Sequence, residues 1–229
     1  MPYQIFYLHK GNSNENKLKS SRNRLRQHRK SSSHKPYKSE PPGSSCEQKV
    51  GRCTNIGKRI WNTCNCCRIG EAIKNADVIV LAVWFNTIKE LLQTYAPEFE
   101  GKIIVDPSNP IAPDENSGFK KIIDADESAG QINASFLPKN AKLVKALGTL
   151  GAASLSEAAF KLPERAVLFY ATDDHTFNND VEQLIADVGF VGLRVGGLDQ
   201  SIRIEVFGDL HEFGALGKVV TLAEAKTKL

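Results

Sequence analysis

The 229-residue sequence has no long hydrophobic run, and its first residues lack the features of a secretory signal. No stretch reaches the roughly eighteen apolar residues that a membrane-spanning helix requires, so we expect no membrane partner. The first ten residues contain neither an apolar core nor a small-residue cleavage site, and we therefore expect a cytoplasmic protein. Hydrophobic residues still make up 41% of the chain, which is enough for a substantial core.

Residues 71–229 also lack cysteine and an excess of positive charge, in contrast to residues 1–70. The first segment holds 15 Lys+Arg against 3 Glu, a net charge of +12, and the second holds 15 Lys+Arg against 23 Asp+Glu, a net charge of −8. All five cysteines lie in the first segment, at Cys46, Cys53, Cys64, Cys66 and Cys67. We therefore divide the chain into a basic, cysteine-containing segment (1–70) and a folded domain (71–229).

Short apolar runs rich in β-branched residues recur through the second segment and predict strands. Runs of this kind are typical of strands buried on both faces of a parallel sheet. The predicted strands are Asn75–Val83, Lys102–Asp106, Lys142–Ala146, Ala166–Ala171 and Phe190–Val195. Helical spacing of apolar residues lies between them, for example at Ile88, Leu91, Leu92 and Tyr95, and the stretch from Ser201 to Leu229 predicts a C-terminal helical region. The alternation predicts a doubly wound parallel α/β sheet.

Ligands bind sheets of this type in the loops that follow the carboxyl ends of the strands. This rule selects Val83–Trp84, Pro107–Pro110 and Gly148–Ala152. Their small, proline- and asparagine-containing sequences would let backbone amides approach a ligand closely. Ordinary turns between strands and helices have similar sequences, so the pattern alone leaves both interpretations open.

Four motifs in this segment resemble the family of NADP-dependent oxidoreductases that includes the deazaflavin-coenzyme:NADP reductases. They are ADVIVLAVW (76–84), GKIIVDPSNP (101–110), KLVKALGTLGA (142–152) and the acidic turn ATDD (171–174). Pyrroline-5-carboxylate reductases are more distant relatives with a similar N-terminal domain. The resemblance covers Glu71 to the C-terminus and implies a Rossmann-like fold, NADP as cofactor, and a deazaflavin coenzyme as a candidate second partner.

The resemblance also implies which residues contact the cofactor. The loop that matches Ala82, Val83 and Trp84 packs on NADP in this family. The loops that match Asn109 and Pro110, and Thr149, Leu150 and Ala152, approach its nicotinamide end. The G-x-G-x-x-G turn that holds the pyrophosphate at a helix N-terminus would lie about sixty residues upstream of Asp77. The chain as written has no such motif there, so we expect a sheet that lacks its first strands.

Residues 1–70 admit three interpretations. A largely disordered or irregular basic arm would bind nucleic acid or another polyanion, and SSRNRLRQHRKSSSHK (20–35) suits such an arm. A folded cysteine-rich module is the second interpretation, but C-x-C-C with two separate cysteines lacks the paired spacing of structural zinc, and we predict no metal. The third is that the segment is translated one nucleotide out of frame with the rest.

The shifted frame explains more of the pattern than the other two interpretations. Every Arg codon has G in its second position, so Arg22, Arg24, Arg26 and Arg29 permit G-x-G-x-G-x-x-G one nucleotide forward. Each Cys codon becomes Ala or Val, and residues 43–49 permit V-A-V-A-S-R-K, a second strand that ends in basic residues suited to the 2′-phosphate of NADP. We therefore favour a frameshifted front of the same domain over a nucleic-acid-binding arm.

These observations predict an NADP(H)-dependent oxidoreductase that transfers hydride to a second redox cofactor or small substrate and is impaired in this chain by loss of the phosphate-binding turn. The alternative is a non-enzymatic NADP-binding or nucleic-acid-binding protein that uses the basic arm. Hydride transfer needs no nucleophile, and we assign no catalytic residue. We expect His175 to begin a helix, His211 to pack or lie at the surface, and Asp106 either to brace its loop or to contact a ligand. The C-terminal helices are a candidate homodimer surface.

Overall fold

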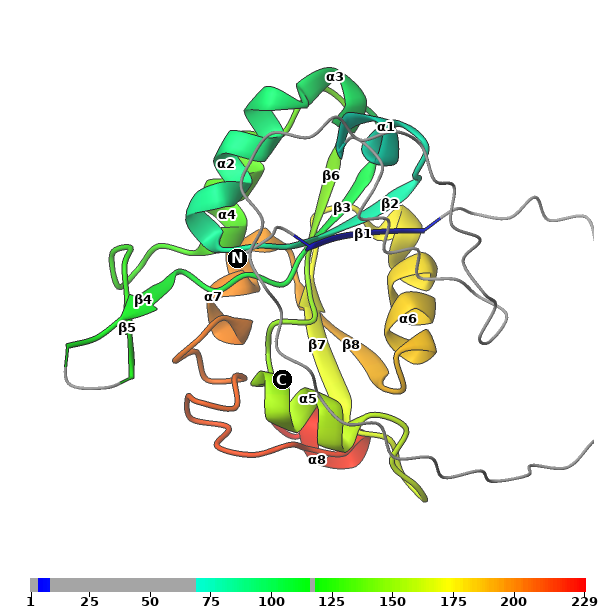
Figure 1. Ribbon diagram of the computed structural model, residues 1–229. Helices are drawn as coiled ribbons and strands as arrows, with labels where there is room; N and C mark the ends of the chain where they lie inside the picture. Colours follow the sequence, from blue (N-terminus) through cyan, green and yellow to red (C-terminus); the bar gives the residue numbers. More distant parts are fainter. Residues whose placement is uncertain (1–3, 9–68, 116–117) are drawn as a thin grey trace, which may run out of the picture. The chain divides into compact units, whose positions relative to one another are not determined.

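The computed structural model describes residues 4–8, 69–115 and 118–229, which belong to one compact unit of the chain. Within these residues the main sheet has six strands in the order β1-β2-β3-β6-β7-β8, and β4 and β5 form a separate hairpin (Figure 1). The strands are β1 (Gln4–Leu8), β2 (Val78–Ala82), β3 (Ile103–Asp106), β4 (Ile111–Pro113), β5 (Phe119–Lys121), β6 (Lys142–Lys145), β7 (Val167–Ala171) and β8 (Val191–Gly196). The helices are α1 (Ile69–Lys74), α2 (Phe85–Thr94), α3 (Ala96–Phe99), α4 (Ala129–Ala134), α5 (Ala152–Ala158), α6 (Asn178–Asp187), α7 (Ser201–Ile204) and α8 (Leu222–Lys226), with 3-10 helices η1 (His175–Phe177) and η2 (Leu198–Gln200).

These elements confirm the predicted α/β fold class, and each of the five strands predicted after residue 71 is present. The arginine-rich stretch, the cysteines and the shifted-frame fingerprint fall in residues 9–68 and lie outside the described residues. Within the described part of the chain, no helix is both long enough and apolar enough to cross a bilayer.

Strand direction differs in part from the predicted parallel sheet. Strands β2, β3 and β6 are parallel, and so are β7 and β8, but β7 runs antiparallel to β6 and meets it at a single residue pair, Lys145 with Ala171. The sheet is therefore mixed. The sequence does not predict this reversal, because a continuous apolar run indicates only that a strand is buried on both faces. A buried antiparallel strand gives the same pattern as a parallel one.

Strand β1 lies in the segment for which we expected largely irregular structure. Its backbone pairs antiparallel with the whole of β2, from Gln4 opposite Ala82 to Leu8 opposite Val78. An edge strand exposes unpaired N–H and C=O groups that any extended segment can satisfy. The position beside β2, where we expected strands to be missing, is thus filled by an antiparallel strand.

The core follows from alternation along the strands. Val78 and Val80 of β2 belong to the apolar cluster beneath α6, whereas Ile79 and Leu81 belong to the cluster beneath α1, α2 and α3. This two-residue period places successive side chains on opposite faces of the sheet. Figure 1 shows α2, α4 and α7 on one side of the sheet and α6 on the other. The apolar spacing predicted for α2 is confirmed, because Ile88, Leu91 and Leu92 are buried.

The C-terminal stretch contains fewer helical residues than predicted. Helices α7 and α8 are short, and turns occupy most of residues 205–221. Helix α7 ends at Ile204, its C-cap residue Glu205 has an extended backbone, and Phe207 adopts a positive φ of 70°. A close backbone approach follows, because a Cβ atom on Gly214 would lie 1.8 Å from the carbonyl oxygen of Gly208. Only glycine permits this fold of the chain.

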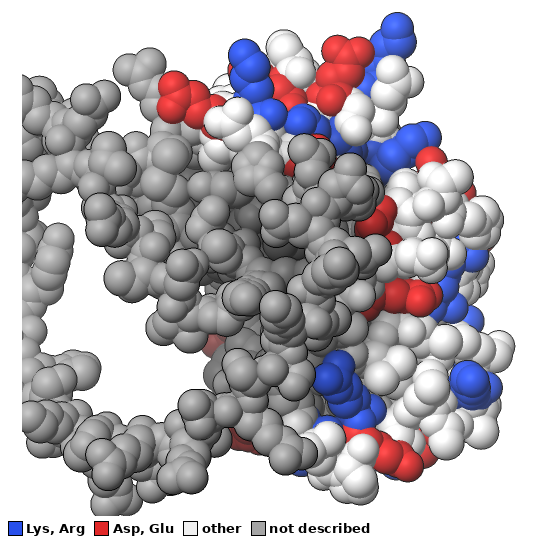
Figure 2. All heavy atoms as spheres, turned by 90° about the vertical axis from the view of Figure 1, so that its right-hand side faces the viewer, with Lys and Arg blue, Asp and Glu red and all other residues white. Residues whose placement is uncertain are grey.

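Charged side chains of both signs are interspersed on the face that Figure 2 presents. Blue and red groups alternate over its described part, and no large area there carries one sign. The described part of that face therefore lacks the continuous basic patch that typically binds a polyanion.

Candidate functional site

The carboxyl ends of β2, β3 and β6 lie at one edge of the sheet because these three strands are parallel and in register. The predicted loops after β3 and β6 touch each other there. A Cβ atom on Gly148 would lie 2.4 Å from the carbonyl oxygen of Pro107, so only glycine allows this approach. The preceding residue, Leu147, has a φ of 67°, which is uncommon for a residue with a side chain.

A buried ion pair lies directly beneath these loops. The Nζ atom of Lys145 is 3.1 Å from Oδ2 of Asp106, and the two side chains are 3% and 0% exposed. The same Oδ2 atom accepts a hydrogen bond from Nδ2 of Asn133, at 2.9 Å. The other carboxylate oxygen accepts from the backbone N–H of Ser108 at 2.7 Å, and Lys145 also donates to the Ser108 carbonyl. Asp106 thus braces its loop, which was one of its two predicted roles.

Asn109 joins three segments that are far apart in the sequence. Its Nδ2 atom donates to the carbonyl oxygen of Gly148 at 3.0 Å, and its Oδ1 atom accepts from the backbone N–H of Val206 at 2.7 Å. Both polar atoms of its side chain are therefore engaged within the protein. Its predicted neighbour Pro110 is buried. The structure brings these residues to the predicted edge, with the amide of Asn109 as a brace between loops.

The loop after β2 presents the most open surface of the three. Trp84 is 54% exposed, and Ala82 and Val83 are half-buried. Trp84 is also the N-cap residue of α2, and no side chain caps this helix or places a negative charge in its first turn. Backbone N–H groups in the first turn of a helix attract anions. The loop therefore combines an aromatic surface with helix-end hydrogen-bond donors that no side chain caps.

The loop after β6 is different, because the protein supplies its own anion there. The carboxylate of Glu212 accepts from the backbone N–H of Gly151 at 2.6 Å and from the hydroxyl of Ser154. Thr149 and Leu150 are buried, and Ala152 is exposed. The amide at Gly151 that would approach a ligand is thus already paired, and Ala152 offers the accessible surface of this loop.

Two buried hydroxyl groups at this edge have no hydrogen-bond partner. They are Oγ of Ser108 and Oγ1 of Thr149, which follow β3 and β6. Buried polar atoms are nearly always paired in native proteins, so unpaired ones point to a missing water or ligand. Together with the uncapped first turn of α2, these groups fit one end of a polar cofactor. The described residues contain no glycine-rich turn for its pyrophosphate.

His211 is a packing residue, as predicted, although it lies in the interior. It is 1% exposed; Nε2 is 3.0 Å from the carbonyl oxygen of Gly148, and Nδ1 accepts from the backbone N–H of Phe213, also at 3.0 Å. Burial lowers the pKa of His211 below its ordinary value. The ring is therefore neutral near pH 7, with the proton on Nε2, and it ties the C-terminal turn to the Gly148 loop. His175, by contrast, begins η1, as predicted.

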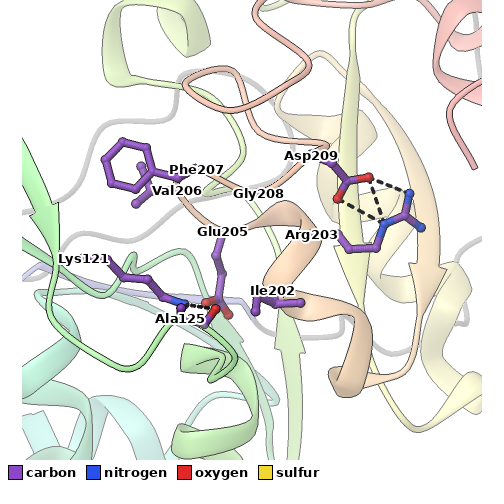
Figure 3. Close-up of a pocket in the computed structure, with 9 residues that line it drawn as sticks. All are labelled: Lys121, Ala125, Ile202, Arg203, Glu205, Val206, Phe207, Gly208 and Asp209. Atoms are coloured by element: carbon purple, nitrogen blue, oxygen red, sulfur yellow. Dashed lines mark hydrogen bonds and ion pairs between the residues drawn. The ribbon is translucent and has the colours of Figure 1, made fainter.

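A pocket adjoins this edge through Val206. It has a volume of about 390 Å³ and is lined by Lys121, Ala125, Ile202, Arg203, Glu205, Val206, Phe207, Gly208 and Asp209 (Figure 3). Phe207 is 51% exposed, whereas Glu205 is buried and accepts from the backbone N–H groups of Ala129 and Gly130. Val206 lines the pocket and donates its backbone N–H to Asn109, so one hydrogen bond joins the pocket lining to the loop after β3.

Three residues that organise the candidate site were not predicted from the sequence: Lys145, Glu205 and Glu212. Lys145 carried a usable signal, because a lysine within the buried run KLVKA demands a partner for its charge. Neither glutamate had such a signal. Each lies in a turn-rich stretch and acts on a helix more than fifty residues earlier, with separations of 75 for Gly130 and 61 for Gly151.

A protein-family model matches part of the chain. The family model described as "NADP oxidoreductase coenzyme F420-dependent" matches residues 46–110. The matched region contains β2, β3 and two of the three loops, and it begins inside the basic first segment. This match confirms the resemblance to NADP-dependent oxidoreductases. Comparison with curated proteins gives no match.

Two of the solved structures to which this chain is similar show a similar fold. A hypothetical protein from Sinorhizobium meliloti is 26% identical, with 66% of this chain and 69% of that chain covered and a TM-score of 0.55. A "putative F420 dependent NADP-reductase" from Arthrobacter sp. FB24 is 23% identical, with a TM-score of 0.50, and the match covers 58% of this chain and 60% of that one. A pyrroline-5-carboxylate reductase from Coxiella burnetii is 18% identical, with a TM-score of 0.41 and coverage of 58% and 42%.

Proposed function

We propose that the chain is an NADP(H)-dependent oxidoreductase that transfers hydride between NADP and a second redox cofactor or small substrate. One observation carries this proposal. The oxidoreductase family model matches the region that forms β2, β3 and the loops at their carboxyl ends. In α/β sheets those loops are where dinucleotides bind.

The proposed cofactor contacts lie on three loops. They are Ala82, Val83 and Trp84 after β2, Asn109 and Pro110 after β3, and Thr149, Leu150 and Ala152 after β6. Bound NADPH would supply the hydride, or bound NADP⁺ would accept it, and the protein's part is to hold the ring system in position. The exposed face of Trp84 gives a flat apolar surface beside the uncapped first turn of α2. The hydroxyls of Ser108 and Thr149 would gain partners from a bound ligand or its waters.

We place the second substrate in the pocket beside Val206. The hydrogen bond from Val206 to Asn109 joins the pocket lining to the loop proposed to approach the nicotinamide end. Phe207 presents an exposed aromatic ring there, and Ile202 adds apolar surface. A planar ring system such as a deazaflavin coenzyme suits such walls, because flat rings stack on aromatic side chains.

The described residues at this edge do not offer an acid–base pair. Both ring nitrogens of His211 are hydrogen-bonded to the backbone, and burial keeps the ring neutral. The carboxylates of Asp106, Glu205 and Glu212 all accept hydrogen bonds from the protein itself. The proposed reaction is therefore direct hydride transfer between two aligned rings, without proton transfer by these groups.

We further propose that residues 1–70 correspond to the front of the same domain in a shifted reading frame. The shifted frame permits the glycine fingerprint that the chain as written lacks. Loss of that turn removes the phosphate-binding amides, so the chain as written would bind NADPH weakly. The coding DNA tests this hypothesis, since stop codons in the other frame through this stretch would exclude it. The cytoplasmic location and a homodimer through the C-terminal helices remain predictions.

A second function, binding of nucleic acid through the basic arm, rests on residues outside the described part. Its signature would be DNA affinity that falls steeply with salt concentration. The charges on the described face in Figure 2 are mixed and give this alternative no support.

Calorimetric titration with NADPH tests the proposed function. We would titrate the chain as written, a version with the frame restored, and the Trp84→Ala variant of the better binder. We expect tight binding only after restoration, and a loss of roughly tenfold in affinity from Trp84→Ala. Phe160→Ala is the matched control, because Phe160 is an aromatic residue of similar exposure (60%) outside the site. No binding by any form, or equal effects of the two variants, would contradict the proposal.

A further inference from the structure

We propose that Lys145 is a positioning residue for this site, an inference that rests on the proposed function. Its ammonium group fixes the backbone of Ser108 and Asn109, which in turn sets the loop that approaches the nicotinamide ring. Lys145 is the last residue of β6 and is 3% exposed. A lysine is almost never buried to this degree unless its charge is paired.

The contacts of Lys145 hold the turn after β3 from two sides. Asp106 accepts from the N–H of Ser108, and Lys145 donates both to Asp106 and to the carbonyl of Ser108. The N–H and the C=O of a single residue are thus fixed by the two members of one ion pair. Ser108 lies two residues beyond the end of β3, outside the regular ladder of the sheet. The ion pair therefore supplies the backbone hydrogen bonds of Ser108 that a neighbouring strand would supply within the sheet.

The constraint passes directly to the next residue. Asn109 uses its side chain to bind the Gly148 carbonyl and the Val206 N–H, so its orientation depends on where the Ser108 backbone lies. Gly148 in turn accepts from His211. One chain of contacts thus runs from Lys145 through Asn109 to the wall of the pocket.

Stability alone does not explain why the protein keeps this pair. Replacing both members of a buried ion pair by uncharged residues of similar size is often neutral or stabilising, because both charges lose their hydration when they are buried. The feature that an apolar pair could not reproduce is the hydrogen bond to the Ser108 carbonyl. That bond acts on the turn that the proposed function places against the cofactor.

Two double variants isolate this hydrogen bond from the charge. Asp106→Asn with Lys145→Gln and Asp106→Asn with Lys145→Met are both uncharged at the pair, and glutamine and methionine have similar size. The amide oxygen that Asp106→Asn introduces can still accept from the Ser108 N–H in either variant. Only glutamine can donate to the Ser108 carbonyl, so the two variants differ chiefly in that bond.

Amide hydrogen exchange of the full-length protein gives the first readout. In the methionine variant we expect the backbone amides of Ser108 and Asn109 to exchange on the order of tenfold faster than in the glutamine variant, with β7 unchanged in both. In the frame-restored protein we expect kcat to be lower by roughly tenfold in the methionine variant, because a small displacement of the ring costs rate. The KM for NADPH would change less than kcat.

The two readouts separate failure of this inference from failure of the proposed function. Equal exchange rates in the two variants would overturn the role of Lys145 whether or not NADPH binds. A difference in exchange without a difference in kcat would show that Lys145 holds the turn for stability only, which also overturns the inference. If no form oxidises NADPH, the proposed function fails, and the positioning role for that reaction fails with it, while the exchange data identify the structural contact.

Discussion

The two ends of strand β6 carry lysines in opposite surroundings. At the amino end, Lys142 lies 3.2 Å from Asp174, and the side chains are 47% and 25% exposed. At the carboxyl end, Lys145 lies 3.1 Å from Asp106, and the side chains are 3% and 0% exposed. Nearly equal distances therefore describe two different interactions. Water and salt screen the first pair, whereas the second is buried and hydrogen-bonded to the loop that follows β3.

The difference shows that the side-chain contacts that hold loops together lie at the carboxyl end of β6. At the carboxyl end, Asn109, His211 and Glu212 all bridge loops that are distant in sequence. At the amino end, the pair is a surface contact between β6 and the turn before η1. The family match also covers β2, β3 and the loops that follow them at the carboxyl end.

The largest effect should come from removing the charge of Lys145 at the carboxyl end of β6, with removal of the charge of Lys142 at the amino end as the comparison. Lys145→Met leaves the Asp106 carboxylate buried without its cation, which should lower the free energy of unfolding by about 3–5 kcal/mol. Lys142→Met removes only a surface partner and should leave the urea midpoint nearly unchanged. Urea denaturation followed by circular dichroism would measure both. Equal destabilisation by the two variants would contradict the distinction between the two ends.

The next effect concerns the pocket at the carboxyl edge. In the frame-restored protein, Phe207→Ala should raise the KM for a deazaflavin coenzyme by about tenfold, because the ring loses a stacking surface. The reaction would be measured by the decrease in NADPH absorbance. The affinity for NADPH itself should not change. Phe160→Ala is a matched control, since both residues are exposed phenylalanines with positive φ, 58° for Phe160 and 70° for Phe207. A similar rise in KM for both variants would remove the pocket from the mechanism.

A smaller effect should appear as a pH dependence from His211. Burial lowers its pKa in the folded protein, so between that value and the ordinary value of about 6.5 the unfolded chain binds more protons. The contribution of His211 to stability is therefore complete above about pH 6.5 and decreases as the pH falls toward the folded pKa. His211→Gln can still donate to the Gly148 carbonyl and should show a weaker loss of stability between pH 7 and pH 5. Thermal unfolding at several pH values would detect this, and parallel curves for both proteins would refute it.

The smallest effect should come from α8, whose N-cap residue Thr221 pairs with Ala166 just before β7. A hydrogen bond from Lys218 at 2.6 Å, supported by the N–H of Thr221 at 2.9 Å, lowers the pKa of Glu224 to about 2. This stabilisation is present above the unfolded pKa and is lost as the pH falls from about 4.5 toward 2. Glu224→Gln should lower the melting temperature slightly at pH 7 and not at pH 2. A clear dependence of the difference on salt is also expected.

Part of the site was predictable from local sequence alone. The runs NADVIVLAV, KIIVD and KLVKA predicted the positions of β2, β3 and β6, and the rule for strand ends then selected the loops that contain Trp84, Asn109 and Thr149. These predictions succeed because the period of apolar residues and the position of the following turn are local properties. The helix α2 was predicted for the same reason.

Other features could not be predicted because they depend on contacts between distant segments. The reversal between β6 and β7 and the pairing of Gln4–Leu8 with β2 depend on which backbone edges meet, and apolar runs do not encode direction. In the sequence, Glu205 and Glu212 look like ordinary glutamates of a protein surface. Only the tertiary structure places them against the first turns of α4 and α5.

The sequence by itself therefore determined an α/β sheet, the edge at which its loops converge and a resemblance to NADP-dependent oxidoreductases. It could do so because the burial pattern of a strand or helix and the residues that form a turn depend on residues that are close together in the sequence. The tertiary structure decided that Lys145 pairs with Asp106 in the interior while Lys142 stays at the surface. Both lysines belong to one four-residue strand, and only the packing of β3, α4 and the following loop around one end gives them different roles.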